Sequence, residues 1–272
     1  MTPPIFWISA LVGSLVSTTF ALTLPEYRGL KTAQNGSVLE VTLHNPTSEI
    51  NLWGQDFQDG LTDMVQRLQT DNETKVVIFK SDVPRFFCAH VDLLIPDIRA
   101  VEGRARGAGN EFLLALDMRF ATKKETQFGQ IEVATGLVPG GGGGQMLSQI
   151  IGRGLAMEYV LSGKDINAKD AEKIGWINKA FDHSADMYAH IDDLTSRYRL
   201  FPRGALVAAK KSINLWARPP QDNFLRDAAA FSGRLADPVV MQLVGRALSL
   251  TQNLSLGDVE LNLGRDLPLL YT

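Results

Sequence analysis

The chain has 272 residues and a formal net charge of −3, and this length suits one large domain or a folded core with a helical appendage. Because the charge is small and no stripe of basic residues stands out, we expect no nucleic-acid partner. The single cysteine, Cys88, excludes an internal disulfide framework, and the four scattered histidines form no cluster of metal-ligand spacing, so we predict no metal site.

The first predicted element is an uncharged apolar segment at residues 5–24. It is typical of the hydrophobic region of a signal peptide, and Thr19-Phe20-Ala21 offers a cleavage site of the small-x-small kind. We therefore interpret residues 1–21 as a signal-peptide-like segment, although Met-Thr-Pro-Pro before it lacks the usual basic residue. The segment is nearly as long as the roughly 20 residues that span a bilayer. A membrane anchor or a mis-assigned start is the alternative, and membrane contact is expected only if the segment is retained.

Strands and helices alternate in the next part of the chain. Residues 37–44 alternate apolar and polar side chains, which predicts a half-buried strand. Apolar residues at helical spacing from Phe57 to Leu68 predict an amphipathic helix, and residues 76–79 predict a buried strand. This alternation favours an α/β architecture. Further short strands are predicted at 96–101, 117–121 and 175–181.

The stretch 103–132 combines a glycine-rich turn, an apolar helix and two glutamates. Gly107 and Gly109 let the backbone approach a ligand closely because they have no side chain. A helix beginning near Gly109 is apolar nearly all round, so we expect it to be buried. Its N-terminus would attract an oxygen that gains negative charge. Glu111 in the first turn and Glu132 beyond the next strand are carboxylates that could converge there, which suggests acid/base chemistry.

The remaining chain is a glycine run followed by helices. No Lys-Ser/Thr of a phosphate-binding loop follows the five glycines at 140–144, so we interpret them as a close backbone turn before a helix from Gln145. After residue 201 the Ala/Leu-rich, proline-bounded pattern predicts only helices. The last residues, GRDLPLLYT, are interpreted as a tail without a peroxisomal ending. The predicted helices are 202–215, 221–235 and 238–250.

Several segments together resemble the enoyl-CoA hydratase/isomerase (crotonase) family, in the order in which the family has them. The resemblance covers most of the chain after about Gly36. It implies a crotonase-like spiral of ββα units at 22–200 and a C-terminal helical region at 201–272. In the family this region builds homo-oligomers, a trimer or a dimer of trimers, and a helical cap on a monomer is the alternative. The segments are FFCAHVDL at 86–93, the stretch 103–132, TQFGQIEVATGLVPGGGGGQ at 126–145, RGLAMEYVLSGKDINAKDAEKIGWINKAF at 153–181 and AAKKSIN at 208–214.

The resemblance also implies a reaction. The family's acyl-CoA thioesters react through an enolate, and two backbone N–H groups stabilise its oxygen. The matching positions are Ala89 and Ala108, for which two ordinary tight turns are the alternative. Glu111 and Glu132 match the catalytic pair, of which one activates water and the other supplies a proton. Coenzyme A is then part of the substrate, and no separate cofactor is expected.

Each of these residues also has a plainer interpretation. Glu111 would be a carboxylate favoured by a helix start, and Glu132 a solvated charge at a strand end. The two lie one residue further apart than is commonest in the family, and we place the extra residue in the polar loop 122–126. His90, Gly107 and Gly109 are predicted to border the substrate, with a structural role as the alternative for His90.

The chain departs from the family after Asp92, where a helical segment of a few dozen residues that walls the acyl pocket is missing. Arg99 also stands in a strand that should be apolar. Such a gap would open the pocket to water and weaken substrate positioning. The predicted function is hydration of a 2-enoyl-CoA, with double-bond isomerisation, mainly through Glu132, as a neighbouring possibility.

Two other functions stay open. One is a catalytically impaired crotonase-fold protein that binds an acyl-CoA or a protein partner, and the other is a fold-sharing thioester hydrolase. The location is open as well. The signal-like start indicates the secretory pathway, whereas the family's chemistry implies the cytoplasm, mitochondrion or peroxisome.

Overall fold

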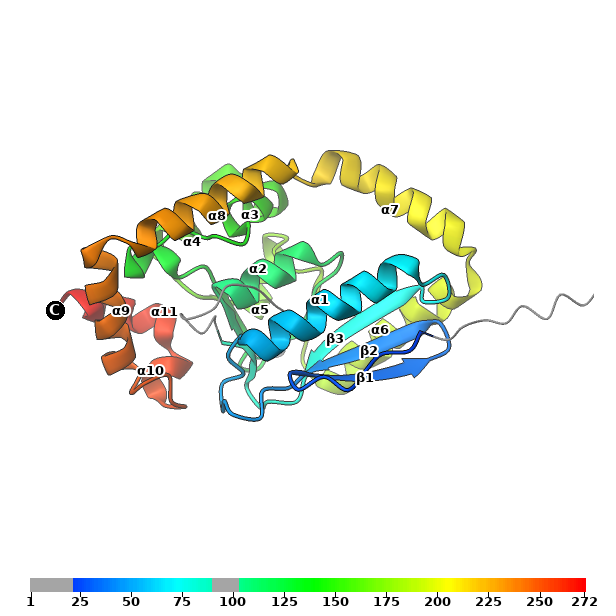
Figure 1. Ribbon diagram of the computed structural model, residues 1–272, viewed down its shortest axis with the longest axis horizontal. Helices are drawn as coiled ribbons and strands as arrows, with labels where there is room; N and C mark the ends of the chain where they lie inside the picture. Colours follow the sequence, from blue (N-terminus) through cyan, green and yellow to red (C-terminus); the bar gives the residue numbers. More distant parts are fainter. Residues whose placement is uncertain (1–21, 90–102) are drawn as a thin grey trace, which may run out of the picture.

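A computed structural model describes residues 22–89 and 103–272 of the chain (Figure 1). The first sheet contains β1 (Leu30–Asn35), β2 (Val38–Leu43) and β3 (Val76–Ser81), in that order. β1 is antiparallel to β2, and β2 is parallel to β3, so helix α1 (Gln55–Thr70) makes the crossover between the parallel pair. The strands predicted at 37–44 and 76–79 and the amphipathic helix are confirmed, whereas β1 was not predicted.

Two further sheets follow. The second has the order β4-β5-β7-β8, in which β4, β5 and β7 are parallel and β8 is antiparallel to β7. The third is the parallel pair β6 and β9, which overlaps the strands predicted at 117–121 and 175–181 only in part. The strand predicted at 96–101 and the signal-like segment 1–21 lie outside the described residues. The bounds are β4 (Phe86–Cys88), β5 (Arg104–Arg106), β6 (Phe120–Thr122), β7 (Gln127–Gly129), β8 (Ile166–Asn167) and β9 (Lys179–Phe181).

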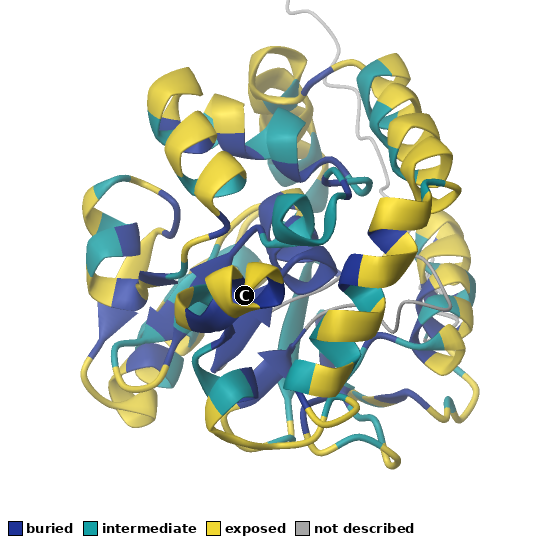
Figure 2. Cartoon of the chain, turned by 90° about the vertical axis from the view of Figure 1, so that its left-hand side faces the viewer, coloured by how far each residue is buried: buried dark blue, intermediate teal, exposed yellow. Residues whose placement is uncertain are grey.

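Helices surround these sheets and bury large aromatic side chains with them. Trp53, Phe57, Phe128 and Trp176 are almost completely buried in the main core. Figure 2 shows the buried residues concentrated in the central strands and the exposed ones on the surrounding helices. The helices of this part are α2 (Ala108–Ala115), η1 (Glu132–Thr135), α3 (Gly143–Ile151), α4 (Arg153–Ser162), α5 (Ala168–Lys173) and α6 (Ser184–Leu200), with η for a 3-10 helix.

The C-terminal region is helical, as predicted, but it has no tail. The three predicted helices are confirmed as α7 (Arg203–Ala217), α8 (Gln221–Leu235) and α9 (Pro238–Leu250). In Figure 1, α7 and α8 form an arc along one side of the molecule. The tail prediction is wrong because Leu267 and Leu270 are buried against Leu243 and Leu263 in a second apolar cluster. The last elements are α10 (Asp258–Leu261), α11 (Leu263–Asp266) and η2 (Leu267–Tyr271).

The predicted α/β architecture with C-terminal helices therefore holds for the described residues. Within 22–89 and 103–272, no helix combines the length and apolar character that crossing a bilayer requires.

Candidate active site

Glu111 lies in the first turn of α2, where the sequence predicted a buried helix. The helix is buried from Ala108 to Leu114, and Glu111 itself is only 4% exposed. Its amide donates to the carbonyl of Gly107, which precedes the helix with φ of +51° and ψ of −125°. This left-handed region favours glycine, so the turn into α2 depends on the residue type at Gly107.

The Glu111 carboxylate is bound by the glycine run. Oε1 of Glu111 accepts the amide of Gly141 at 2.9 Å and the amide of Gly143 at 2.7 Å. Hydrogen bonds from backbone N–H groups to a carboxylate are stronger than bonds between neutral groups. The prediction of a close turn before a helix is confirmed, although α3 begins at Gly143 instead of Gln145. The two amides of this turn therefore bind the Glu111 carboxylate of the same polypeptide.

Glu132 follows β7 and begins η1, against the same turn that precedes α2. It is half-buried, and its Oε1 accepts Nε2 of Gln130 at 2.9 Å. A Cβ added to Gly107 would lie 3.1 Å from that Oε1, so the carboxylate is in close contact with this glycine. The interpretation of Glu132 as a solvated strand-end charge is therefore wrong.

A buried hydrogen-bond chain leads to Glu132, and sequence reasoning missed it. Nε1 of Trp176 donates to Oδ1 of Asn110 at 2.9 Å, and Nδ2 of Asn110 donates to Oε1 of Gln130 at 2.7 Å. Gln130 then donates to Glu132. An indole N–H can only donate, so Trp176 fixes the orientation of both amides and makes Glu132 an acceptor. The available signal was an amide residue close to each predicted glutamate, Asn110 next to Glu111 and Gln130 just before Glu132.

Gln130 also connects the two glutamates. A Cβ added to Gly143 would lie 2.6 Å from Cδ of Gln130, and the amide of Gly143 binds Glu111. Gln130 thus contacts the turn that binds one glutamate and donates to the other. The structure therefore brings the predicted acid/base pair to one region, at the start of α2.

Of the two predicted backbone donors, only Ala108 faces this region. It is the first residue of α2, and amides at the start of a helix have no acceptor within the helix. Gly109 follows it and is buried. The amide of Ala89 instead donates to the carbonyl of Ile50 at 3.2 Å, and the Ala89 carbonyl accepts the Arg106 amide at 3.2 Å. The prediction for Ala89 is corrected accordingly, because its amide is bound to the Ile50 carbonyl and its carbonyl to the Arg106 amide of β5.

His90 lies outside the described residues. Among the residues at 22–89 and 103–272, no group of three or more His, Cys, Asp or Glu side chains is placed to hold a metal ion.

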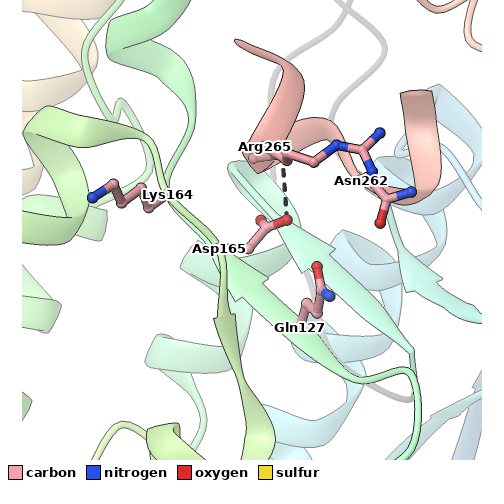
Figure 3. A pocket seen from close by; sticks show the side chains of 6 residues that line it. Gln127, Lys164, Asp165, Asn262 and Arg265 are labelled. Carbon is pink, nitrogen blue, oxygen red and sulfur yellow. Dashed lines mark hydrogen bonds between the residues drawn. The ribbon is translucent and has the colours of Figure 1, made fainter. Parts of the chain in front are cut away.

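A separate pocket of about 240 Å³ lies at the C-terminal elements, and neither glutamate lines it (Figure 3). Asp165 and Arg265, two of its charged side chains, already have partners. Asp165 accepts Nε and Nη2 of Arg106 and the amide of Gly264, the last bond being dashed in Figure 3. Arg265 pairs with Asp258 and Asp266. We therefore assign this pocket no role in the chemistry. Its lining residues are Gln127, Lys164, Asp165, Asn262, Gly264 and Arg265.

The chain is similar to known proteins over about half of its length. A model of the family described as "Enoyl-CoA hydratase/isomerase" matches residues 91–230. Enoyl-CoA hydratase domain-containing protein 2, mitochondrial, of Mus musculus is 30% identical over 177 residues, which cover 55% of this chain and 59% of that protein. Methylglutaconyl-CoA hydratase, mitochondrial, of Homo sapiens is 29% identical over 187 residues, covering 57% of this chain and 54% of that protein. The chain thus spans less than two thirds of the length of these curated relatives.

Solved structures match over more of the chain. A putative enoyl-CoA hydratase from Streptomyces avermitilis has a TM-score of 0.82 and 32% identity, and the match covers 90% of this chain and 98% of that one. A carnitinyl-CoA hydratase from Mycobacterium avium has a TM-score of 0.72 at 22% identity, covering 86% of this chain and 100% of that one, and shows the fold alone. The predicted crotonase-like fold with C-terminal helices is confirmed.

Proposed function

Because this chain belongs to the enoyl-CoA hydratase/isomerase family, we propose that it adds water across the double bond of a 2-enoyl-CoA. One observation carries the proposal: two glutamates from separate elements meet at the turn that begins α2, and Gln130 links their positions. A single buried carboxylate has many structural explanations, whereas a pair held at a helix N-terminus suits acid/base chemistry beside a developing oxyanion.

The proposed reaction uses both glutamates. One carboxylate accepts a proton from water as the water oxygen bonds to the β-carbon of the enoyl group. The π electrons move toward the thioester oxygen, and the amide of Ala108 donates to this oxygen. The other carboxyl group then gives a proton to the α-carbon, and the thioester carbonyl forms again. Coenzyme A takes part only as a portion of the substrate.

Amide substitutions at the two glutamates test the proposal. Glu111→Gln and Glu132→Gln keep the shape of the side chain but remove its acid/base capacity, so kcat for crotonyl-CoA should fall by about 10²–10⁴-fold. Loss of the enone absorbance measures the rate. Glu158→Gln makes the same change at an exposed position of α4 and should leave the rate unchanged. Wild-type rates in both site variants, or an inert but folded wild type, would sink the hydratase proposal.

The second candidate function is binding of an acyl-CoA without turnover. The engaged amide of Ala89 favours it, because loss of one oxyanion donor typically lowers kcat by about 10²–10³-fold. Calorimetric titration with a CoA thioester separates the two functions. Heat of binding together with no loss of enone absorbance supports the binding function, and turnover of the titrant supports the hydratase.

We also propose that the chain forms homo-oligomers through its C-terminal helices. The support is the exposure of apolar side chains on α7, whose 15 residues include none that is buried.

A further inference from the structure

Helix α8 places one face against the glycine run that binds Glu111. Phe224, Asp227 and Phe231 lie three and four residues apart, so they share one side of the helix. Although no residue of α8 is buried, this side contacts the run directly.

The two phenylalanines lie so close to the backbone of the run that only glycine fits. A Cβ added to Gly140 would lie 2.8 Å from Cβ and Cγ of Phe231. A Cβ added to Gly142 would overlap the ring of Phe224, and the φ of +98° at Gly142 also favours glycine. The rings therefore rest on the peptide backbone itself.

Polar contacts fix the same face of α8 on the first turn of α3. Nε2 of Gln145 donates to Oδ1 of Asp227 at 3.3 Å, and Nδ2 of Asn223 donates to Oε1 of Gln145 at 3.3 Å. Burial raises the pKa of the Asp227 carboxyl, and the hydrogen bond from Gln145 partly offsets this effect. The register of α8 along the run is therefore set by a hydrogen-bonded pair as well as by packing.

Alternate residues of the glycine run thus contact different partners. Gly140 and Gly142 meet the phenylalanines, whereas Gly141 and Gly143 donate their amides to Glu111. A segment of glycines has little stiffness of its own, so its conformation depends on what packs against it.

We propose that Phe224 and Phe231 are positioning residues that hold Glu111 for catalysis through the glycine run. This role rests on the proposed function, since it matters for the reaction only if Glu111 takes part in proton transfer. Neither ring needs to touch the substrate. Loss of a ring lets the run move, and the carboxylate then departs from its reactive orientation, to which rates are sensitive. The expected signature is a lower kcat with little change in KM.

Hydrogen exchange tests the positioning without any assay of activity. In Phe224→Ala, the amides of Gly141 and Gly143 should exchange about 10-fold faster or more, because the bonds to Glu111 open more often. Leu225→Ala truncates the neighbouring residue, which is 59% exposed, and should leave the exchange unchanged. Phe224→Leu keeps apolar bulk over Gly142 and should restore most of the protection. Equal exchange in Phe224→Ala and wild type would overturn the proposal.

A double-mutant cycle connects the positioning to catalysis. Phe224→Ala should lower kcat about 10-fold in the wild type but have little effect in Glu111→Gln, because both changes act on the same group. Independent losses in the two backgrounds would contradict the positioning role. Thermal unfolding reports whether each variant is folded, and Phe231→Ala, which removes the ring over Gly140, carries the same cycle if Phe224→Ala is not.

The two proposals fail in different ways. Full activity in Glu111→Gln refutes the proposed function, whatever the exchange shows. If Glu111→Gln is impaired but Phe224→Ala has the exchange rates and the kcat of the wild type, the positioning role alone is refuted.

Discussion

Trp176 acts on Glu132 indirectly, through hydrogen bonds that pass along the side chains of Asn110 and Gln130. It is completely buried, with its indole edge-on to the ring of Tyr159 at a centroid distance of 5.4 Å. Its N–H determines which end of Asn110 accepts, and this choice passes along Gln130 to the Glu132 carboxylate. Removal of the first donor would leave a buried acceptor without its partner and would release the constraint on both amides.

Trp176→Phe should therefore destabilise the fold by about 1–3 kcal/mol, the usual effect of a buried polar group that loses its hydrogen bond. The measurement is the free energy of unfolding in urea. Trp216→Phe is the matched control, because Trp216 is 90% exposed, and its effect should stay within about 0.5 kcal/mol. Equal stabilities of the two variants would mean that the indole N–H contributes nothing to the chain of bonds.

Asp71 makes the stability of the fold depend on pH. Its carboxylate accepts the amides of Glu73 and Thr74 just after α1 ends. Burial raises the pKa of Asp71, but the hydrogen bonds from Thr74 and from the two amides outweigh it, so the net pKa is below the ordinary 3.8. A depressed pKa in the folded state stabilises the protein above the unfolded value, and this contribution is lost as the pH falls through the folded pKa.

The prediction is a difference between two pH values. Wild type should be more stable than Asp71→Asn at pH 6. The gap should shrink as the pH falls below about 3.8 and through the lower pKa of the folded-state carboxylate. Urea unfolding at pH 6 and at a pH below about 3.8 measures this stability gap. A gap that is the same size at both would show that the charge of Asp71 is irrelevant.

At the scale of elements, the C-terminal helices hold both glutamates in place. α8 packs on the turn that binds Glu111, while α9 and η2 pack on η1, which begins with Glu132. The Tyr271 hydroxyl donates to the Ala134 carbonyl at 2.9 Å, and Nε of Arg234 donates to the Gly136 carbonyl at 2.8 Å. The region that the family resemblance links to assembly therefore also contacts both segments of the candidate site.

The elements that sequence predicted well are those whose pattern is local. α8 and α9 were predicted to the residue because prolines bound them and their apolar residues recur at helical spacing. β4 and β5 have only three residues each, and β5 places Arg104 and Arg106 in a buried strand. Such a short strand carries no periodic signal. Its two arginine side chains can be buried only because acceptors far away in the sequence form hydrogen bonds with them.

The residues of the candidate site also divide into those with a local sequence signal and those that depend on distant partners. Glu111 and Glu132 could be chosen from residue type and surroundings, whereas Asn110 and Gln130 gain meaning only from partners elsewhere in the chain. The error at Ala89 has the same cause. Whether a backbone amide faces a ligand or a neighbouring carbonyl depends on tertiary structure, and here the carbonyl of Ile50 takes it.

At the scale of the whole molecule, one buried arginine fastens the C-terminal elements to the core. The Arg106 side chain is fully buried and forms two bonds to Asp165. It also donates to the carbonyls of Glu260 and Leu261 at 2.8 and 3.2 Å. The last helices therefore dock through backbone carbonyls as well as through the apolar cluster, and no pattern of side chains reveals the bonds to the carbonyls.

Asp165→Asn should destabilise the protein by about 3–5 kcal/mol, because it leaves the buried guanidinium without its counter-charge. Limited proteolysis should then cut first near residues 257–272, and urea unfolding gives the free energy. Arg106→Met combined with Asp165→Leu removes both charges and should recover part of the loss. A single variant as stable and as resistant as wild type would rule out this fastening role.

The surface of α7 leads to a prediction about assembly. Ile213, Leu215 and Trp216 are 67%, 87% and 90% exposed, while Lys210 joins the helix to Asp117 by an ion pair of 2.6 Å. A helix of this length is marginal in water without packing against a neighbour. Exposed apolar residues gathered on one such helix are typical of an interaction surface. In the proposed homo-oligomer, α7 packs against a second copy of the chain.

Trp216→Glu places a charge in that surface and should lower the molar mass measured by light scattering after gel filtration, because burial of an unpaired carboxylate in an interface is unfavourable. Leu161→Glu, at a position of α4 that is 64% exposed, is the matched control and should keep the wild-type mass. Since α8 follows α7 directly and rests on the glycine run, the dissociated variant should also show faster exchange at Gly141 and Gly143. A wild type that is monomeric at micromolar concentration, or a Trp216→Glu variant of unchanged mass, would refute assembly through α7.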